Sequence, residues 1–137
     1  MKMEHLFSPL TINTMTLKNR AVMPAMGTGY GNADATIGER LIAYLARRAR
    51  GGTGLIITEV CAVDPRGKGF GSEIGAWDDA FIPGLSRLAA AVHGEGGKIA
   101  LQLHHAGRET FEAVVGGKPE APSPIPSVVL GQPCEEM

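Results

Sequence analysis

The sequence lacks the features that identify several broad classes of protein. It has only two cysteines, Cys61 and Cys134, which are far apart and have no Cys or His partner at zinc-ligand spacing. They predict neither a disulfide framework nor a metal site, and Cys61 is expected to be a buried thiol. Lysine and arginine number 13 against 14 aspartates and glutamates, so no basic surplus points to nucleic acid or to an anionic membrane.

Long apolar runs are also missing. No segment stays apolar over the roughly 20 residues that a membrane-spanning helix needs. The amino terminus (MKMEH) has no apolar core of the kind found in signal peptides. We therefore expect a soluble, cytoplasmic chain that has neither a membrane nor a nucleic-acid partner.

The sequence does contain a regular alternation of strand-like and helix-like segments, separated by many of its 19 glycines. Apolar runs of strand length occur at residues 20–26, 55–60 and 98–103. Proline cannot donate to a strand ladder, so the first regular strand is expected to end at Pro24. The third run is apolar along its length, which predicts burial on both faces of a parallel sheet.

Two amphipathic helices are predicted between these strands. Thr36 and Glu39 have capping-box spacing at the start of the first helix. Asp79 is expected to cap the second helix, with Pro83 in its first turn. The residues expected to face the core are Ile37, Leu41, Tyr44, Leu45 and Ala49 in the first helix and Ile82, Leu85, Leu88, Ala89 and Val92 in the second. Strand, helix, strand, helix, strand in this order predicts a parallel sheet, preceded by a hairpin or cap at residues 6–17.

Polar side chains gather at the end of the third strand, where parallel folds place their ligands. The amide of Gln102 suits the edge of a heterocycle, or it is satisfied by neighbouring strand ends. His104 and His105 are adjacent, so their side chains point in opposite directions and cannot hold one metal ion together. Arg108 is expected to hold a phosphate or carboxylate, or to tie down the following segment through its carbonyl groups.

Two further segments leave alternatives open. The glycine-rich turn at residues 27–31 would let backbone N–H groups approach an anion, or it is simply a flexible turn. Asn32 stands where the dinucleotide-binding fingerprint needs its third glycine, which argues against that motif. After Arg108, five prolines and no helical period predict an extended tail. We therefore divide the chain into a partial barrel at 1–108 and a proline-rich loop or tail at 109–137, cut off mid-fold.

Taken together, the motifs resemble the old yellow enzyme family. The matching segments, in order, are residues 6–10 (LFSPL), 17–28 (LKNRAVMPAMGT), 54–59 (GLIITE) with Ala62 and Val63, 97–108 (GKIALQLHHAGR) and 121–123 (APS). The PAMGT version of the second segment looks most like the enoate reductase and 2,4-dienoyl-CoA reductase branch. The resemblance covers nearly the whole chain, and it identifies the chain as an amino-terminal portion of such an enzyme.

This resemblance implies an α/β fold: the first three β/α repeats of a (β/α)8 TIM barrel with an N-terminal hairpin cap. It implies FMN as cofactor, NADH or NADPH as hydride donor, and reduction of the activated C=C bond of an unsaturated carbonyl or acyl-CoA substrate. The residues that it implies for the cofactor site are Pro24, Ala25, Met26, Gly27, Thr28, Ala62 and Gln102. Gly27 or Thr28 would stand near the N5–O4 edge of the flavin, and Gln102 would bond its pyrimidine edge.

Much of the family pattern is absent from the sequence. A (β/α) barrel needs about 250 residues, and the family's proton-donating tyrosine, its His/Asn pair and its phosphate-binding loops have no counterpart here. No catalytic residue and no metal ligand is assigned, and an iron–sulfur cluster belongs only to a longer parent. We expect the chain alone to be inactive, to bind FMN weakly or not at all, and to self-associate or pair with the missing part of the barrel. The alternatives are a non-catalytic product or interaction module, and an unrelated phosphate-binding α/β domain.

Overall fold

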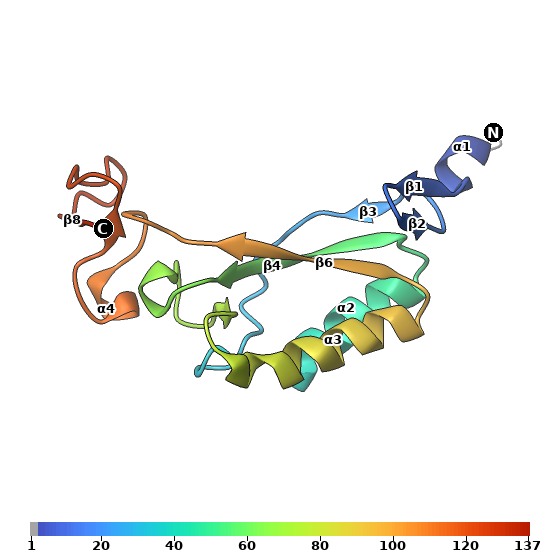
Figure 1. The fold of residues 1–137 in the computed structure, drawn as a ribbon, viewed down its shortest axis with the longest axis horizontal. Coiled ribbons are helices and arrows are strands. Elements are labelled where there is room, and N and C mark those ends of the chain that lie inside the picture. Colours follow the sequence, from blue (N-terminus) through green and yellow to red (C-terminus); the bar gives the residue numbers. More distant parts are fainter. Residues whose placement is uncertain (1–2) are drawn as a thin grey trace.

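The centre of the molecule is a parallel sheet covered on one face by two helices (Figure 1). In this computed structural model, which describes residues 3–137, β4 (Leu55–Ala62) pairs in parallel with β3 (Val22–Met23) and with β6 (Lys98–His104). Helices α2 (Glu39–Arg50) and α3 (Ile82–Gly94) connect these strands. The order β3, α2, β4, α3, β6 confirms the predicted alternation and the parallel sheet. Residues 1 and 2, part of the predicted 1–108 unit and of the segment examined for a signal peptide, lie outside the described residues.

The remaining elements are short. Helix α1 (Glu4–Phe7) precedes an antiparallel hairpin of β1 (Leu10–Ile12) and β2 (Met15–Leu17), which confirms the predicted hairpin. The other elements are the 3-10 turns η1 (Pro65–Gly67) and η2 (Asp79–Phe81), the strand β5 (Ile74–Gly75), the helix α4 (Glu112–Val115) and the strands β7 (Glu120–Ala121) and β8 (Glu135–Glu136). β5 pairs in parallel with the end of β4, and β7 pairs with β8.

The core lies between the sheet and the two helices. Its buried members include Leu41, Leu45 and Ala49 of α2, Leu88 and Val92 of α3, and Ile56 and Cys61 of β4. Fully burying one such leucine, isoleucine or valine side chain contributes about 1.5–3 kcal/mol, so this shared apolar surface fixes which face each helix presents. Within residues 3–137, no helix is long and apolar enough to cross a membrane.

Both predicted helix caps are wrong. Helix α2 begins at Glu39 with Gly38 as its N-cap, and no side chain caps it. The Thr36 hydroxyl is already engaged in the preceding turn, where it donates to Asp34 Oδ1 (2.6 Å) and accepts from Asn32 Nδ2 (2.9 Å). Local turn hydrogen bonds of this kind compete with helix capping.

The start of α3 also differs from the prediction. Asp78, not Asp79, accepts a hydrogen bond from Ala80 N (2.8 Å), and it caps the 3-10 turn that precedes α3. The helix itself begins at Ile82, with Pro83 in its first turn as predicted. Ile82 is 54% exposed and is wrongly placed in the predicted core stripe.

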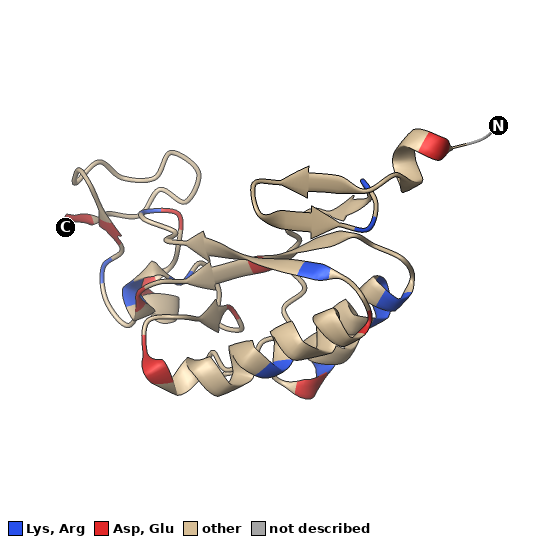
Figure 2. Ribbon diagram, turned by 45° about the vertical axis from the view of Figure 1, so that its right-hand side comes forward, with Lys and Arg blue, Asp and Glu red and all other residues tan. Residues whose placement is uncertain are grey.

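The two long strands differ in burial. β4 is buried along most of its length, whereas no residue of β6 is fully buried and Leu103 is 65% exposed. Burial on both faces was predicted for residues 98–103, and it is wrong for β6, which these residues form. It is right for β4. Among the described strands β6 pairs only with β4, and its partly buried Ile99 and Leu101 pack against the core. Figure 2 shows charged residues of both signs on the helices and loops, while the central strands carry few.

The segment after Arg108 folds back onto the loop that follows β4. Arg66 in that loop forms ion pairs with Glu120 and Glu135, and it also donates to the carbonyl of Lys118 (2.6 Å). Arg108 Nη1 donates to the carbonyl of Ile125 (3.0 Å). Of the two roles left open for Arg108, tying down the tail is the one seen. The buried Thr110 adds a further contact, because its hydroxyl donates to the carbonyl of Lys68 in the same loop (2.6 Å).

Candidate functional site

The predicted site residues occupy the carboxyl ends of three parallel strands that lie side by side. In the register of the sheet, Gln102 of β6 stands opposite Val60 of β4, and its backbone N–H donates to Thr58 Oγ1 (3.1 Å). The Gln102 side chain is exposed, and no partner for it is found among the described residues. Gln102 is therefore not satisfied by neighbouring strand ends, which was the structural alternative for it.

The segment that follows β3 is open. Regular pairing stops at Met23, so the strand ends immediately before Pro24, as predicted, although it is much shorter than residues 20–26. Pro24, Met26 and Gly27 are exposed, with Met26 at 57%, and Ala25 is half-buried. A Cβ added at Gly27 would meet nothing within 4 Å, so this turn borders open space.

Thr28 is held by Glu59, a buried residue of β4 that was not among the predicted site residues. Its backbone N–H donates to Glu59 Oε2 (2.6 Å), and its hydroxyl donates to the same oxygen. Glu59 is only 2% exposed, and its other oxygen, Oε1, is buried without a hydrogen-bond partner. An acidic residue inside an otherwise apolar strand was the signal, because a buried carboxyl group needs a specific partner. The contact ties the turn after β3 to the end of β4.

Ala62 and Val60, both near the end of β4, differ in burial. Ala62 is completely buried, with Gly75 of β5 and His104 of β6 as its register partners on either side. Its side chain is therefore not part of the open surface. Val60 is half-buried and stands beside Gln102, which makes it a neighbour of the site that sequence reasoning missed.

The two histidines after Gln102 serve different partners. His104 Nδ1 lies 2.7 Å from Oε1 of Glu73, which is wholly buried, and Glu73 Oε2 accepts from Gly69 N (2.6 Å). His105 packs against Gly67, where an added Cβ would lie 2.6 Å from its ring. The described residues contain no group of three or more His, Cys, Asp or Glu able to hold a metal ion. Both histidines thus hold the loop between β4 and β5.

Cys61 is a buried thiol, as predicted. Burial, and secondarily the negative charge of Glu73, raise the pKa of this thiol to about 11. The neutral form therefore dominates at ordinary pH, and a neutral thiol is neither a nucleophile nor a metal ligand.

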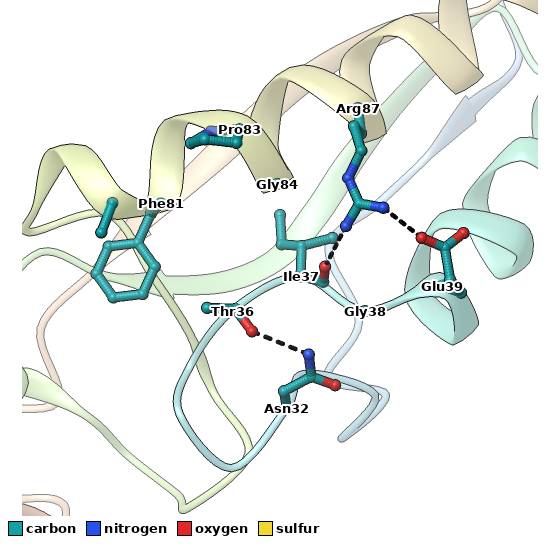
Figure 3. Close-up of a pocket in the computed structure, with 10 residues that line it drawn as sticks. Asn32, Thr36, Ile37, Gly38, Glu39, Phe81, Pro83, Gly84 and Arg87 are labelled. Atoms are coloured by element: carbon teal, nitrogen blue, oxygen red, sulfur yellow. Dashed lines mark hydrogen bonds and ion pairs between the residues drawn. The ribbon is translucent and has the colours of Figure 1, made fainter.

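Hollows on the helix side of the sheet are lined by none of the predicted cofactor-site residues. One, of about 470 Å³, lies between the starts of α2 and α3, where Arg87 pairs with Glu39 and donates to Ile37 O (Figure 3). A second, of about 240 Å³, is apolar and lies between α3 and β6. The candidate site is instead the open surface formed by the turn after β3 and the end of β6.

The chain is similar to several characterised oxidoreductases. The sequence model of the NADH:flavin oxidoreductase / NADH oxidase family matches residues 5–136. The chain is 46% identical to an NADH oxidase of Thermoanaerobacter brockii over 134 residues. The aligned residues make up 96% of this chain and 21% of that protein. It is 41% identical to an NADPH dehydrogenase of Listeria monocytogenes serotype 4a over 125 residues, and these make up 90% of this chain and 36% of that protein.

Solved structures give the same result. A complex of 2-naphthoyl-CoA reductase with 2-naphthoyl-CoA has a TM-score of 0.91 at 28% identity, over 98% of this chain and 22% of that one. An old yellow enzyme homologue from Zymomonas mobilis has a TM-score of 0.84 at 30% identity, over 96% of this chain and 39% of that one.

The chain thus spans between about a fifth and two fifths of the length of these relatives. The solved relatives are TIM-barrel enzymes, and the structure has the α/β arrangement of part of such a barrel. The family model covers almost every described residue, and the fold agrees over the same length. The chain therefore belongs to the NADH:flavin oxidoreductase / NADH oxidase family, as its resemblance to the old yellow enzymes predicted.

Proposed function

We propose that this chain forms the ring-binding part of an FMN site in an NADH- or NADPH-dependent oxidoreductase. The observation that carries the proposal is the exposed carboxamide of Gln102, which has no partner in the described residues and stands at the same strand-end edge as the open turn after β3. A carboxamide offers two donors and one acceptor group, which match the alternating carbonyl and N–H groups of a flavin pyrimidine ring.

The residues around Gln102 fit a flat heterocycle. Met26 and Pro24 offer exposed apolar surface, Ala25 is half-buried beside them, and open space surrounds the Cβ position of Gly27. A thioether adapts its shape to an aromatic face and makes favourable contacts with it. In the proposed site these residues line the ring, Thr28 borders the edge that carries N5 and O4, and Ala62 supports this surface from within the sheet.

The proposed reaction is the reduction of an activated C=C bond. When bound, FMN would supply the hydride chemistry, taking a hydride from NADH or NADPH and passing it to the alkene. Relatives support this class: one solved neighbour is a complex with 2-naphthoyl-CoA, and morphinone reductase is known in complex with tetrahydroNAD. We propose an unsaturated carbonyl or acyl-CoA substrate, as in the enoate and dienoyl-CoA reductase branch, a cytoplasmic location, and an iron–sulfur cluster only in a longer parent.

We further propose that this chain alone has no such activity. His104, the histidine nearest to Gln102, is held by Glu73, and no described residue is assigned as a proton donor. Arg66 and Arg108 are bonded to groups of the tail, so neither is free to hold a phosphate. The catalytic acid and the phosphate contacts would come from the rest of a barrel, or the chain would act as a non-catalytic interaction module.

Titration of FMN with the chain, followed by flavin absorbance and fluorescence, tests the proposed ring site. We expect weak but saturable binding that Gln102→Leu weakens by about threefold to tenfold, the loss of one or two hydrogen bonds. Gln132→Leu is the matched control, because Gln132 is bonded to Thr110 in the tail. Equal effects of the two substitutions would refute the role of Gln102, and no saturable binding would refute the ring site.

A further inference from the structure

We propose that one face of α2 is a docking surface for a carboxylate-rich segment of a protein partner. The surface, which we call the arginine–tyrosine face, consists of Arg40, Tyr44, Arg47 and Arg48 of α2 and of Tyr30 in the loop before it. At about 3.6 residues per turn, the four helix positions lie within about a third of the circumference of α2. The inference goes beyond the flavin proposal and does not depend on it, because it uses none of the predicted cofactor residues.

The arginines of this face have no carboxylate partner. Ion pairs with glutamates are formed by four other arginines, Arg50, Arg66, Arg87 and Arg108. Within residues 3–137, no carboxyl group pairs with Arg40, Arg47 or Arg48, although Arg40 and Arg47 are exposed and Arg48 is half-buried. Positive charges that lack counter-charges in their own chain attract an anionic partner.

Two tyrosine rings hold two of the guanidinium groups in place. The guanidinium carbon of Arg40 lies 3.8 Å from the ring centre of Tyr30, and that of Arg48 lies 3.4 Å from the ring centre of Tyr44. The two rings meet edge to face with their centres 5.4 Å apart, so the four side chains form one stack. Arg48 Nη1 also donates to the carbonyl of Tyr44 (3.0 Å). Ordering these groups before a partner arrives lowers the entropic cost of association.

Stacking leaves hydrogen-bond donors available. A guanidinium group that lies flat on a ring still presents N–H groups at its edge, and this edge matches the two oxygens of a carboxylate. No hydrogen bond from the Arg40 side chain is seen within residues 3–137, where its recorded contact is the Tyr30 ring. Arg40 can therefore receive a carboxylate without breaking an existing bond.

The position of Arg40 in α2 is unfavourable for the helix itself. Arg40 is the second residue of α2, where the helix dipole has its positive end. Helix stability therefore accounts for Arg47 and Arg48, which lie near the negative end, but not for Arg40. No side chain caps the start of α2. A carboxylate bound at Arg40 would offset both the charge of the arginine and the positive end of the dipole.

The composition favours an acidic protein segment over a nucleic acid as partner. The chain has 13 lysines and arginines against 14 aspartates and glutamates, so it lacks the basic surplus typical of proteins that bind a phosphate backbone. Arginine and tyrosine are also among the residues that contribute most to binding at protein interfaces. Arg40 and Arg48 are separated by about 12 Å along the helix axis, a distance that carboxylates about four residues apart in an extended peptide can span.

Fluorescence anisotropy of a labelled oligoglutamate peptide, titrated with the chain at low salt, tests this surface. We expect saturable binding that added salt weakens. Arg40→Lys keeps the charge but loses the flat group that stacks on Tyr30, and it should weaken binding about threefold to tenfold, the loss of about one hydrogen bond. Tyr30→Leu leaves every charge in place and should weaken binding to a similar extent.

Arg20→Lys is the matched control, because it makes the same substitution at another exposed arginine, whose Nε bonds to Ser8 Oγ (3.2 Å). It should leave the affinity unchanged. Equal effects of Arg40→Lys and Arg20→Lys would overturn the inference, as would the absence of saturable binding. An oligothymidylate of equal charge that binds as tightly as the peptide would also overturn it, in favour of a phosphate-binding face. The FMN titration tests the proposed function separately.

Discussion

His104 and Glu73 form a carboxylate–imidazole pair that joins the end of β6 to the loop between β4 and β5. His104 Nδ1 lies 2.7 Å from Glu73 Oε1, and the Glu73 side chain has no exposed surface. The second Glu73 oxygen accepts from Gly69 N, so the carboxyl group is satisfied only while His104 is in place. The pair therefore holds the loop against the edge of the sheet where the candidate site lies.

Replacing His104 with alanine should destabilise the fold. The substitution leaves a fully buried carboxyl oxygen without a donor, which costs about 1–3 kcal/mol. Urea unfolding followed by circular dichroism measures the free energy of unfolding. His93→Ala is the control, because His93 is exposed on α3 and should change stability by less than about 0.5 kcal/mol. Equal losses for the two variants would show that the pair contributes nothing to stability.

Cys61 should make stability fall at alkaline pH. Its pKa is raised to about 11 in the folded chain by burial and by Glu73, above the value of about 8.5 of an unfolded thiol. The neutral thiol is favoured in the folded state, so its contribution is complete below pH 8.5 and is lost as the pH rises to 11. Over this window the decline should reach about 1.4 kcal/mol per pH unit.

Comparison with Cys61→Ala isolates this effect from the other groups that titrate in the same range. The difference in slope between the unaltered chain and Cys61→Ala should appear only above pH 8.5. Cys134→Ala is the matched control, because Cys134 lies in the tail and bonds to tail carbonyls. A slope that Cys61→Ala leaves unchanged would contradict the assignment.

Arg66 should control how firmly the tail is docked. It pairs with both Glu120 and Glu135, so Arg66→Ala should loosen residues 118–137 from the loop after β4, while Thr110 stays bonded to the carbonyl of Lys68. Limited proteolysis should then cut within this segment several-fold faster, with the rest of the chain unaffected. Arg47→Ala, an exposed arginine on α2, should leave the cleavage rate unchanged. If both variants resist proteolysis equally, the tail is held by other contacts.

The open side of β6 should cause self-association. Leu103 is 65% exposed, and β6 has no second strand partner among the described residues. Exposed apolar strands of this kind favour pairing with another chain. Leu103→Arg should shift the chain towards monomer in size-exclusion chromatography with light scattering. Val128→Asp, at a 93% exposed position in the tail, should not, and a monomeric unaltered chain would contradict the prediction.

Parts of the fold follow from the sequence because local chemistry decides them. Pro24 ends β3 because it lacks a donor, and the helical spacing of Leu41 and Leu45 identifies the buried face of α2. The predicted cap at Thr36 was wrong because the Thr36 hydroxyl bonds to Asn32 and Asp34 in the preceding turn instead. Residue spacing alone does not show whether the turn or the helix cap is the more stable arrangement.

The site was harder to predict where it depends on tertiary contacts. Gln102 could be proposed as a site residue because a polar residue after an apolar run is visible in the sequence. Glu59 was passed over because its partner, Thr28, lies 31 residues away and only the pairing of β3 with β4 brings them together. The exposure of Leu103 was unforeseen for a similar reason, since local apolarity does not reveal how many neighbours a strand has.

Binding of FMN and of riboflavin to the unaltered chain tests the central claim most directly. The chain is proposed to hold the flavin ring without holding the phosphate, so both ligands should bind saturably. Their dissociation constants should lie within about twofold of each other, whereas a tenfold difference would correspond to about 1.4 kcal/mol. Competition by inorganic phosphate should have no effect. Absence of saturable binding by both ligands, or FMN binding at least tenfold more tightly than riboflavin, would contradict the account.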